Sequence, residues 1–418
     1  METIIVIIVR PVFWLLRQLF LSCRLGSLIH NWIFYAADRY VGPARFGRFR
    51  DNPEARKIAH HGRWHTQTTI DFVRKNYDLD PRIRRRMIDN FLTQRSFVGF
   101  WRRWKWRMKG FTVPSNIYLS PTYRCNLHCD GCYATCHEHR DELSADEIRG
   151  IAKEQDQFGA LHIVMLGGEP FLREDLWQIY AEFPTTVFDV FTNGTLLGEK
   201  EIARIAELGN VRIFISLEGF RQTTDQRRGE GAYEKVMNAL RLCQKARIYY
   251  CVSVTVGREN FDEVTSDEFV QMLNGLGVFA INYVSYMSCG ENPCAFTELS
   301  DDQVVKLTKW GDHIQDNYPI FPIIGRGGSG IVTACPAADS KIHITASGDI
   351  EPCVFCHFAS DNVRSTTILE AMNSGFFQEV RLLNRTGISR FNPCKAGKSA
   401  FLAEEYVLAG AHSTVRSD

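Results

Sequence analysis

The sequence lacks the features that would place it in an extreme class of proteins. Its 13 cysteines among 418 residues amount to about 3%, well below the content of a small disulfide scaffold. Its formal net charge is only +1, and 45% of its residues are hydrophobic. These values exclude a mainly disordered, collagenous or fibrous chain. The length is sufficient for two or three domains.

The low net charge conceals an uneven distribution of charge along the chain. Residues 1–110 hold 22 lysines and arginines against 8 acidic residues, a net charge of +14. Residues 111–418 hold 27 against 40, a net charge of −13. A basic segment joined to an acidic body predicts that the basic segment contacts something anionic.

The first residues contain no uninterrupted apolar run of about 20 residues, the length that a spanning helix needs. Arg10 and Arg17 divide the apolar sequence there, and no convincing signal-peptide cleavage site follows it. Arg10, Arg17 and Arg24 are seven residues apart, so a helix would place them in one stripe among apolar side chains. This pattern favours a helix lying in a membrane interface. A helix packed on the protein or on a dimer partner, and a spanning helix, are the alternatives.

Residues 81–110 form a second basic segment, with ten lysines and arginines against the single acid Asp89. Trp101, Trp104 and Trp106 alternate with basic residues, and both kinds of side chain favour the headgroup zone of an anionic leaflet. The same mixture suits RNA, through phosphate contacts and base stacking, or a solvated helix face. Together with the apolar N-terminus it favours lipid. We therefore expect a cytoplasmic protein that is peripheral on the inner face of the cell membrane.

From residue 117 onward, apolar runs of strand length alternate with amphipathic segments. The predicted strands are 117–121, 161–166, 186–191, 211–217, 248–256 and 278–285. The predicted helices are 144–158, 174–183, 199–208, 232–246, 262–275 and 301–316. The alternation predicts an α/β fold with a parallel sheet, and six units predict a partial (β/α)6 barrel rather than the closed form of eight. Ligands of such sheets bind at the carboxyl ends of the strands.

The most informative motif comes directly after the first predicted strand. Cys125, Cys129 and Cys132 have the spacing C-x3-C-x2-C. Three thiolates within eight residues of one loop favour an iron–sulfur cluster, with a zinc site as the alternative. Three cysteines leave one iron of a [4Fe–4S] cluster open for a ligand that the protein does not supply.

This cysteine motif, followed at once by Tyr133, resembles the cluster-binding motif of the radical S-adenosylmethionine (SAM) superfamily. Further motifs of that family follow the next predicted strands in order: Gly167-Gly168-Glu169-Pro170, Thr192-Asn193-Gly194-Thr195, Ser216-Leu217-Glu218-Gly219 and Asp225-Gln226-Arg227-Arg228-Gly229. The resemblance covers residues 115–320. It depends on the motifs together, because each of them singly is typical of an ordinary turn.

The resemblance implies which residues contact SAM. The glycine-rich motif would receive the amino group, because glycines let a backbone approach closely and a carboxylate pairs with an ammonium group. Ser216 would reach the ribose and Arg228 the carboxylate of SAM, while Glu218 stands where many relatives have aspartate. The implied cofactor-binding residues are Tyr133, Gly167, Gly168, Glu169, Asn193, Ser216, Glu218 and Arg228.

The resemblance also implies the chemistry. Cys125, Cys129 and Cys132 would hold three irons, and SAM would chelate the fourth. Reductive cleavage of SAM would give a 5′-deoxyadenosyl radical, which abstracts a hydrogen atom from a C–H bond of the substrate. The protein would contribute positioning and exclusion of water, and an electron donor such as flavodoxin or ferredoxin would be its partner.

The C-terminal part of the chain contains a second group of cysteines. Cys335 and Cys353 flank a predicted hairpin, and Cys353 and Cys356 form a C-x2-C motif. This arrangement resembles the SPASM/twitch extension, which binds auxiliary iron–sulfur clusters. The resemblance implies one auxiliary [4Fe–4S] cluster held by Cys335, Cys353, Cys356 and Cys394. Further candidate ligands are Cys289, Cys294, His343 and His357.

These observations predict three regions: a basic helical region 1–110, a radical SAM barrel 111–320 and an auxiliary-cluster extension 321–418. The leading hypothesis is a radical SAM enzyme that acts on a lipid or another hydrophobic, membrane-associated substrate. One alternative is a SPASM-type peptide or protein maturase, although residues 1–110 show no pattern of a small winged-helix unit for binding a precursor. RNA modification and a non-catalytic iron–sulfur redox scaffold are the others.

Overall fold

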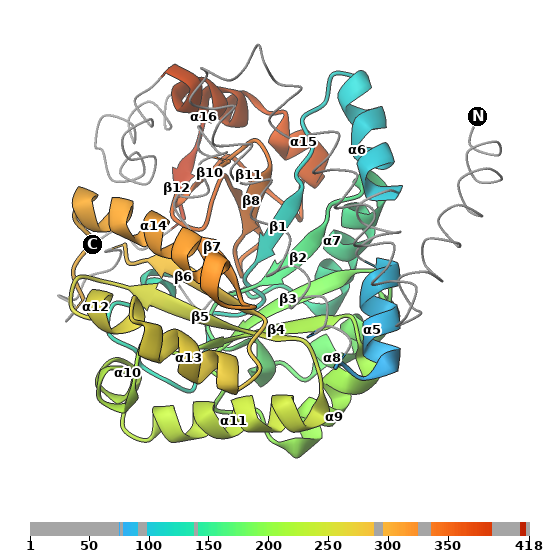
Figure 1. Ribbon diagram of the computed structural model, residues 1–418. Helices are drawn as coiled ribbons and strands as arrows, with labels where there is room; N and C mark the ends of the chain where they lie inside the picture. Colours follow the sequence, from blue (N-terminus) through green and yellow to red (C-terminus); the bar gives the residue numbers. More distant parts are fainter. Residues whose placement is uncertain are drawn as a thin grey trace, which may run out of the picture.

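The computed structural model of the protein describes residues 75, 78–90, 98–137, 141–287, 296–324, 336–386 and 410–414. Ten strands form one mostly parallel sheet, in the order β11-β9-β8-β1-β2-β3-β4-β5-β6-β7 (Figure 1). No helix within these ranges is long and apolar enough to cross a membrane. The predicted interfacial helix near the N-terminus lies outside the described residues.

Seven strands lie side by side in chain order, and each is parallel to the next. They are β1 (Asn116–Leu119), β2 (His162–Met165), β3 (Val187–Thr192), β4 (Val211–Ser216), β5 (Tyr250–Val256), β6 (Ala280–Ser285) and β7 (Phe321–Ile324). The first six confirm the six predicted strands. β7 adds a seventh parallel strand to this sheet, and the predicted domain boundary at residue 320 falls directly before it.

Helices follow most of these strands and cover one face of the sheet (Figure 1). They are α7 (Ala145–Phe158), α8 (Asp175–Glu182), α9 (Glu199–Leu208), α10 (Arg221–Arg228), α11 (Ala232–Ala246), α12 (Phe261–Val264), α13 (Asp267–Gly275) and α14 (Asp301–Asn317), with the short 3-10 turns η2 (Tyr133–Cys136) and η3 (Pro170–Leu172). A capping box between Ser144 and Glu147 begins α7. The helix predicted at 262–275 is divided instead, because the Ser266 side chain caps a new helix start at α13.

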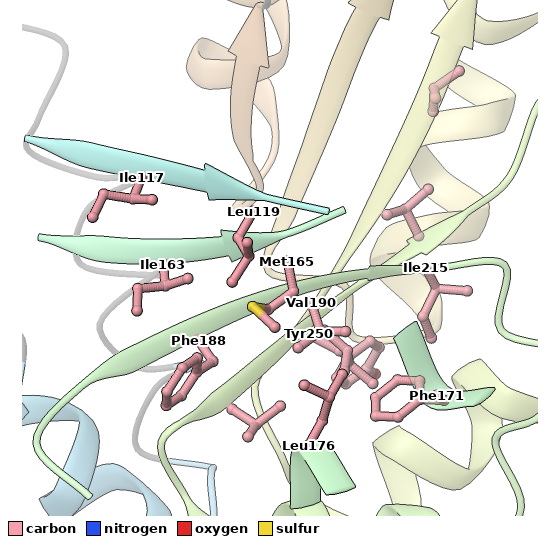
Figure 2. Close-up of a cluster of buried hydrophobic side chains, with 14 of the residues drawn as sticks. Ile117, Leu119, Ile163, Met165, Phe171, Leu176, Phe188, Val190, Ile215 and Tyr250 are labelled. Atoms are coloured by element: carbon pink, nitrogen blue, oxygen red, sulfur yellow. The ribbon is translucent and has the colours of Figure 1, made fainter. Parts of the chain in front are cut away.

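The main core lies between the sheet and these helices. Alternate strand residues such as Ile117, Met165 and Val190 pack there against Phe171 and Leu176 of the covering segments (Figure 2). Side chains alternate along a strand, so the residues between them point to the other, inner face. Near the strand starts, Asp189 on that inner face pairs with Arg212 (2.6 Å) and His162 (3.0 Å). Above this pair, Phe191 stacks on Phe214.

The C-terminal extension continues the same sheet. β8 (Lys341–Ile344) lies parallel to β1 on the side opposite β2, and β9 (Asp349–Glu351) and β11 (Asp361–Asn362) follow it. β8 and β9 confirm the predicted hairpin. The remaining elements are β10 (Phe358–Ala359), which pairs with β12 (His412–Ser413), and the helices α15 (Ile368–Met372) and α16 (Gly375–Thr386).

Two basic helices, α5 (Pro81–Ile88) and α6 (Gly99–Met108), lie against the ends of barrel helices. Arg102 and Arg103 of α6 donate to the carbonyls of Asp156 and Gly159 at the end of α7. Arg86 of α5 donates to the carbonyl of Leu208 at the end of α9. The last carbonyls of a helix lack intrahelical donors and carry its negative dipole end, so arginine stabilises them. Part of the basic charge predicted to meet an anionic partner is therefore engaged by the protein itself.

Replacing Arg103 by methionine tests this role of the basic segment. Arg103 is 8% exposed, and methionine keeps much of its apolar volume while removing the charged donor to Gly159. Charged hydrogen bonds contribute about 1.5–3 kcal/mol, so we expect a loss of that order in urea unfolding of the full chain. Arg82→Met is the control, since the Arg82 side chain is 93% exposed. Equal stability of the two variants would contradict the assignment.

Candidate functional site

The three cysteines of the first motif lie on the loop between β1 and η2, at the carboxyl end of β1. All three are partly buried, and none of them forms a disulfide. Burial is the main cause that raises the pKa of each thiol, and the charges of neighbouring thiols raise it further. The three sulfurs are therefore near enough to repel one another when ionised. A positive metal centre removes this repulsion, so the donor set fits an iron–sulfur cluster.

The glycine-rich loop after β2 runs against the start of the cysteine loop, backbone to backbone. The amide of Gly168 donates to the carbonyl of Thr122 (2.9 Å), and the amide of Glu169 donates to the carbonyl of Arg124 (2.9 Å). A Cβ atom on Gly167 would lie 2.2 Å from the Thr122 oxygen, and one on Gly168 would lie 2.1 Å from the Arg124 oxygen. The prediction gave these glycines a role in approaching SAM. In the structure they are also required for the approach of the cysteine loop.

Tyr133, directly after the third cysteine, connects the same two loops. Its hydroxyl accepts a hydrogen bond from the amide of Gly167 (2.9 Å). Tyr133 therefore joins the two segments that the sequence placed at one site.

Glu169 is fully buried beneath these loops. Its carboxylate accepts hydrogen bonds from the amide of Phe171 (3.1 Å), the hydroxyl of Thr192 (2.9 Å) and the amide of Asn193 (2.8 Å). Burial raises the pKa of Glu169 to about 7, and the hydrogen bonds from the two amides oppose the rise. The side chain thus connects the loop after β2 to the loop after β3.

Asn193 extends this connection to the first cysteine. Its side-chain nitrogen donates to Oδ1 of Asn126 (2.8 Å) and lies 3.8 Å from Sγ of Cys125. Its side-chain oxygen accepts from the amide of Thr195 (2.9 Å). The predicted residue therefore lies beside the cysteine loop and fixes its first turn.

Glu218 organises a buried charge cluster beside the second cysteine. Its carboxylate is 0% exposed and accepts from Arg227 (2.7 Å) and from Arg228. The amide of Thr255 also donates to it (2.9 Å). Nη1 of Arg228 lies 4.0 Å from Sγ of Cys129, and both arginines favour the ionised thiol there. The resemblance implies that Arg228 reaches SAM, and the structure gives Arg228 an additional partner in Glu218.

The other predicted residues are distributed between this site and the extension. Ser216 is the last residue of β4, on the inner face. Cys353 and Cys356 lie in one tight turn after β9, where the amide of Cys356 donates to the carbonyl of Cys353 (3.0 Å). Cys289, Cys294, Cys335 and Cys394 lie outside the described residues.

His357, a candidate ligand from the sequence, belongs to a group next to the cysteine loop whose other two members the sequence did not predict. His137, one residue past η2, approaches Glu351 and His357 of the extension. The group is assembled from segments more than 200 residues apart. The signals in the sequence are the positions of His137, five residues after Cys132, and of His357, directly after Cys356.

Comparisons with protein families agree with this geometry. Residues 119–273 match the radical SAM superfamily, and residues 335–396 match the SPASM iron–sulfur cluster-binding domain. The first match contains the cysteine loop and the motifs through Arg228. The second begins at Cys335 and contains Cys353, Cys356 and Cys394. These matches imply a [4Fe–4S] cluster and SAM at the first site and auxiliary cluster binding at the second.

Several curated proteins are similar to this chain. The sporulation killing factor maturation protein SkfB of Bacillus subtilis is 28% identical over 253 residues, which cover 58% of this chain and 60% of that protein. The mycofactocin maturase MftC of Mycobacterium tuberculosis is 27% identical and covers 69% and 79%. The AdoMet-dependent heme synthase of Methanosarcina barkeri is 23% identical and covers 68% and 91%.

Among solved structures, Streptococcus suis SuiB bound to the precursor peptide SuiA has a similar fold. The TM-score is 0.55 at 15% sequence identity, and the match covers 65% of this chain and 68% of that chain. At this identity the likeness establishes the fold alone. The predicted partial barrel with a cluster-binding extension is confirmed.

Replacing Gly168 by alanine tests the contact between the two loops. The added methyl group would meet the backbone at Arg124, so the cysteine loop must move away. We expect the anaerobically reconstituted variant to lose most of the iron and sulfide of the cluster at the first site. Gly150→Ala on α7 is the matched control, because nothing lies within 4 Å of its Cβ position. Cluster content equal in the two variants would refute the packing argument. A variant in which Cys125, Cys129 and Cys132 are all replaced by alanine gives the iron content of the auxiliary cluster, which is subtracted from each value.

The buried Glu169 predicts a pH dependence of stability. Its pKa rises from 4.5 to about 7 on folding, so the folded protein holds its proton where the unfolded chain has lost it. This stabilising contribution is complete below pH 4.5 and disappears as the pH rises through about 7. Glu169→Gln cannot titrate. The difference in unfolding free energy between wild type and variant should change by up to about 1.4 kcal/mol per pH unit near pH 6. If urea titrations without SAM give the same difference in unfolding free energy at every pH from 5 to 8, the raised pKa of Glu169 is excluded.

Proposed function

We propose that this chain, which belongs to the radical SAM superfamily and carries a SPASM extension, is a maturase that modifies a precursor peptide at an unactivated C–H bond. The maturation proteins SkfB and MftC support this assignment, because their matches extend over 58% and 69% of the chain.

A row of polar residues on the inner face of the sheet is the observation that favours a peptide as the substrate. Ser216, Ser253 and Asn282 occupy paired positions on β4, β5 and β6. Ser216 ends β4, while Ser253 and Asn282 lie in the middle of their strands. Nδ2 of Asn282 donates to Oγ of Ser253 (3.3 Å). Their strand neighbours Ile215, Val252 and Ile281 belong to the opposite, helix-covered face. The row therefore lies on the inner face of the sheet, away from the covering helices.

Such a row suits the backbone of a peptide better than an alkyl chain. Peptide groups carry donors and acceptors that need partners once water is excluded. An alkyl chain placed there would bury the serine and asparagine groups without replacing their bonds to water, at a cost of about 1–3 kcal/mol for each unpaired group. The inner face therefore favours a polar substrate backbone.

The lipid hypothesis receives less support. Its main observation, the striped apolar segment at residues 1–24, lies outside the described residues. Its second observation is the basic segment 81–110. Three arginines of this segment already donate to carbonyls at the ends of α7 and α9. The similar maturases favour the peptide alternative over lipid and over RNA.

The residues of the first site have separate tasks in this proposal. Cys125, Cys129 and Cys132 would hold the cluster that, with SAM bound, supplies hydrogen abstraction from carbon. Glu218 holds Arg227 and Arg228 beside Cys129, where positive charge stabilises the thiolate. Gly167 and Gly168 keep the loop after β2 against the cysteine loop.

The remaining residues orient the cofactor and the substrate. Glu169 and Asn193 hold the loops after β2 and β3 around the first cysteine. Ser216 lies at the end of the polar row. The cysteines of the extension would hold the auxiliary cluster.

Anaerobic turnover with candidate substrates tests the proposed function. The full chain is incubated with SAM and a reductant, and with short peptides encoded next to its gene, a porphyrin or a lipid extract. We expect a peptide to increase the yield of 5′-deoxyadenosine and to change in mass by loss of hydrogen or formation of a new bond. Conversion of the porphyrin instead would assign the chain to the chemistry of the heme synthase.

A substitution in the polar row separates substrate binding from SAM cleavage. Asn282→Leu should leave the cluster and unproductive 5′-deoxyadenosine formation intact while lowering peptide modification at least tenfold, the equivalent of about 1.4 kcal/mol. Gln178→Leu, an exposed polar position on α8, is the matched control. A variant Asn282→Leu with unchanged peptide turnover would remove the argument from the polar row.

A further inference from the structure

Three buried side chains meet between the barrel and the extension. His137 follows η2, Glu351 ends β9, and His357 follows the C-x2-C motif. One ligand atom from each lies within 4.8 Å of those from the other two. His137 is 1% exposed, Glu351 is 0% exposed, and the side chain of His357 is 14% exposed. No described thiol belongs to this group.

The two imidazole rings have unused nitrogen atoms. Nε2 of His137 and both ring nitrogens of His357 are buried and make no hydrogen bond to any described residue. Nδ1 of His357 lies 3.7 Å from Oε1 of Glu351, beyond hydrogen-bond length. Burying such nitrogens without a partner is unfavourable. Each neutral imidazole has one nitrogen with a free lone pair, so a bound cation would coordinate one nitrogen of each ring and give it a partner.

The surroundings hold these groups in position. Tyr123 stacks on His137, with ring centres 4.2 Å apart and planes 5° apart. Oε2 of Glu351 is bonded to Nδ1 of His343 (2.5 Å), whose Nε2 contacts Oγ of Ser120 (2.8 Å). Oε1 of Glu351 accepts from the Thr414 hydroxyl and is the oxygen nearer to His357. Such outer partners orient the ligands of a metal ion.

We propose that His137, Glu351 and His357 bind one divalent zinc-type cation, at a site separate from both groups of cysteines. Two imidazoles and one carboxylate are a donor set that binds Zn²⁺. The ion would connect the loop that follows Cys132 to the segment that follows Cys356. It thereby fixes the cysteine loop of the barrel against the cysteine turn of the extension.

X-ray absorption at the zinc edge tests this site in the full, cluster-loaded protein. The reconstituted protein is given zinc and passed through a desalting column, and its metals are counted by mass spectrometry. We expect one retained zinc for each chain, bound by nitrogen and oxygen at about 2.0–2.1 Å. Sulfur ligation at about 2.3 Å would place the zinc on cysteines and overturn the proposal, as would wild-type protein that retains no zinc.

Matched histidine variants show which side chains bind the ion. His357→Gln should lower zinc retention at least tenfold while keeping the iron and sulfide of both clusters. His412→Gln, an exposed histidine on the neighbouring β12, should retain zinc as the wild type does. If His357→Gln is unstable, the wild-type absorption spectrum still decides the question, because it requires no variant. Equal zinc in both variants would exclude His357 as a ligand.

Discussion

Two loops that follow neighbouring strands touch each other through their backbones, and the first site depends on this contact. The loop after β1 carries the three cysteines, and the loop after β2 donates amides to it from Gly168 and Glu169. The separation leaves no space for a side chain at Gly167 or Gly168. The remaining parts of the site, Tyr133, Glu169 and Asn193, bind one or both of these loops. A loop with three thiols that repel one another once ionised needs such external support.

Electrostatics complements this geometry. Buried thiols resist ionisation, yet thiolates are the form that ligates iron. Two arginines next to Cys129 oppose the effect of burial, and Glu218 keeps those arginines paired in the interior. Without Glu218, two buried positive charges would face each other beside the loop. The glutamate that departs from the family's usual aspartate is thus an integral part of this charge cluster.

The sequence predicted the barrel strands well because each of the first six is an apolar run bounded by turn residues. It did not predict β7, since Phe321–Ile324 is short, contains Pro322 and stands at the point where the pattern changes. The cysteine, glycine-rich and Asn193 residues were predicted to share a site because carboxyl ends of parallel strands meet at one edge. The group of His137, Glu351 and His357 was not predicted, because only the three-dimensional fold brings these segments together. The engagement of Arg103 by Gly159 was equally invisible, since a basic run looks the same whether it meets a helix end or a lipid.

The pairing of β8 with β1 has a consequence for the architecture of the whole chain. β1 is an interior strand only because the extension supplies its second neighbour. A protein cut before residue 336 would expose a row of unpaired peptide groups along β1, which is an open template for intermolecular strand addition. The strand so exposed is the one that leads directly into the cysteine loop. The extension is therefore part of the barrel sheet and not a separate module that can be removed from it.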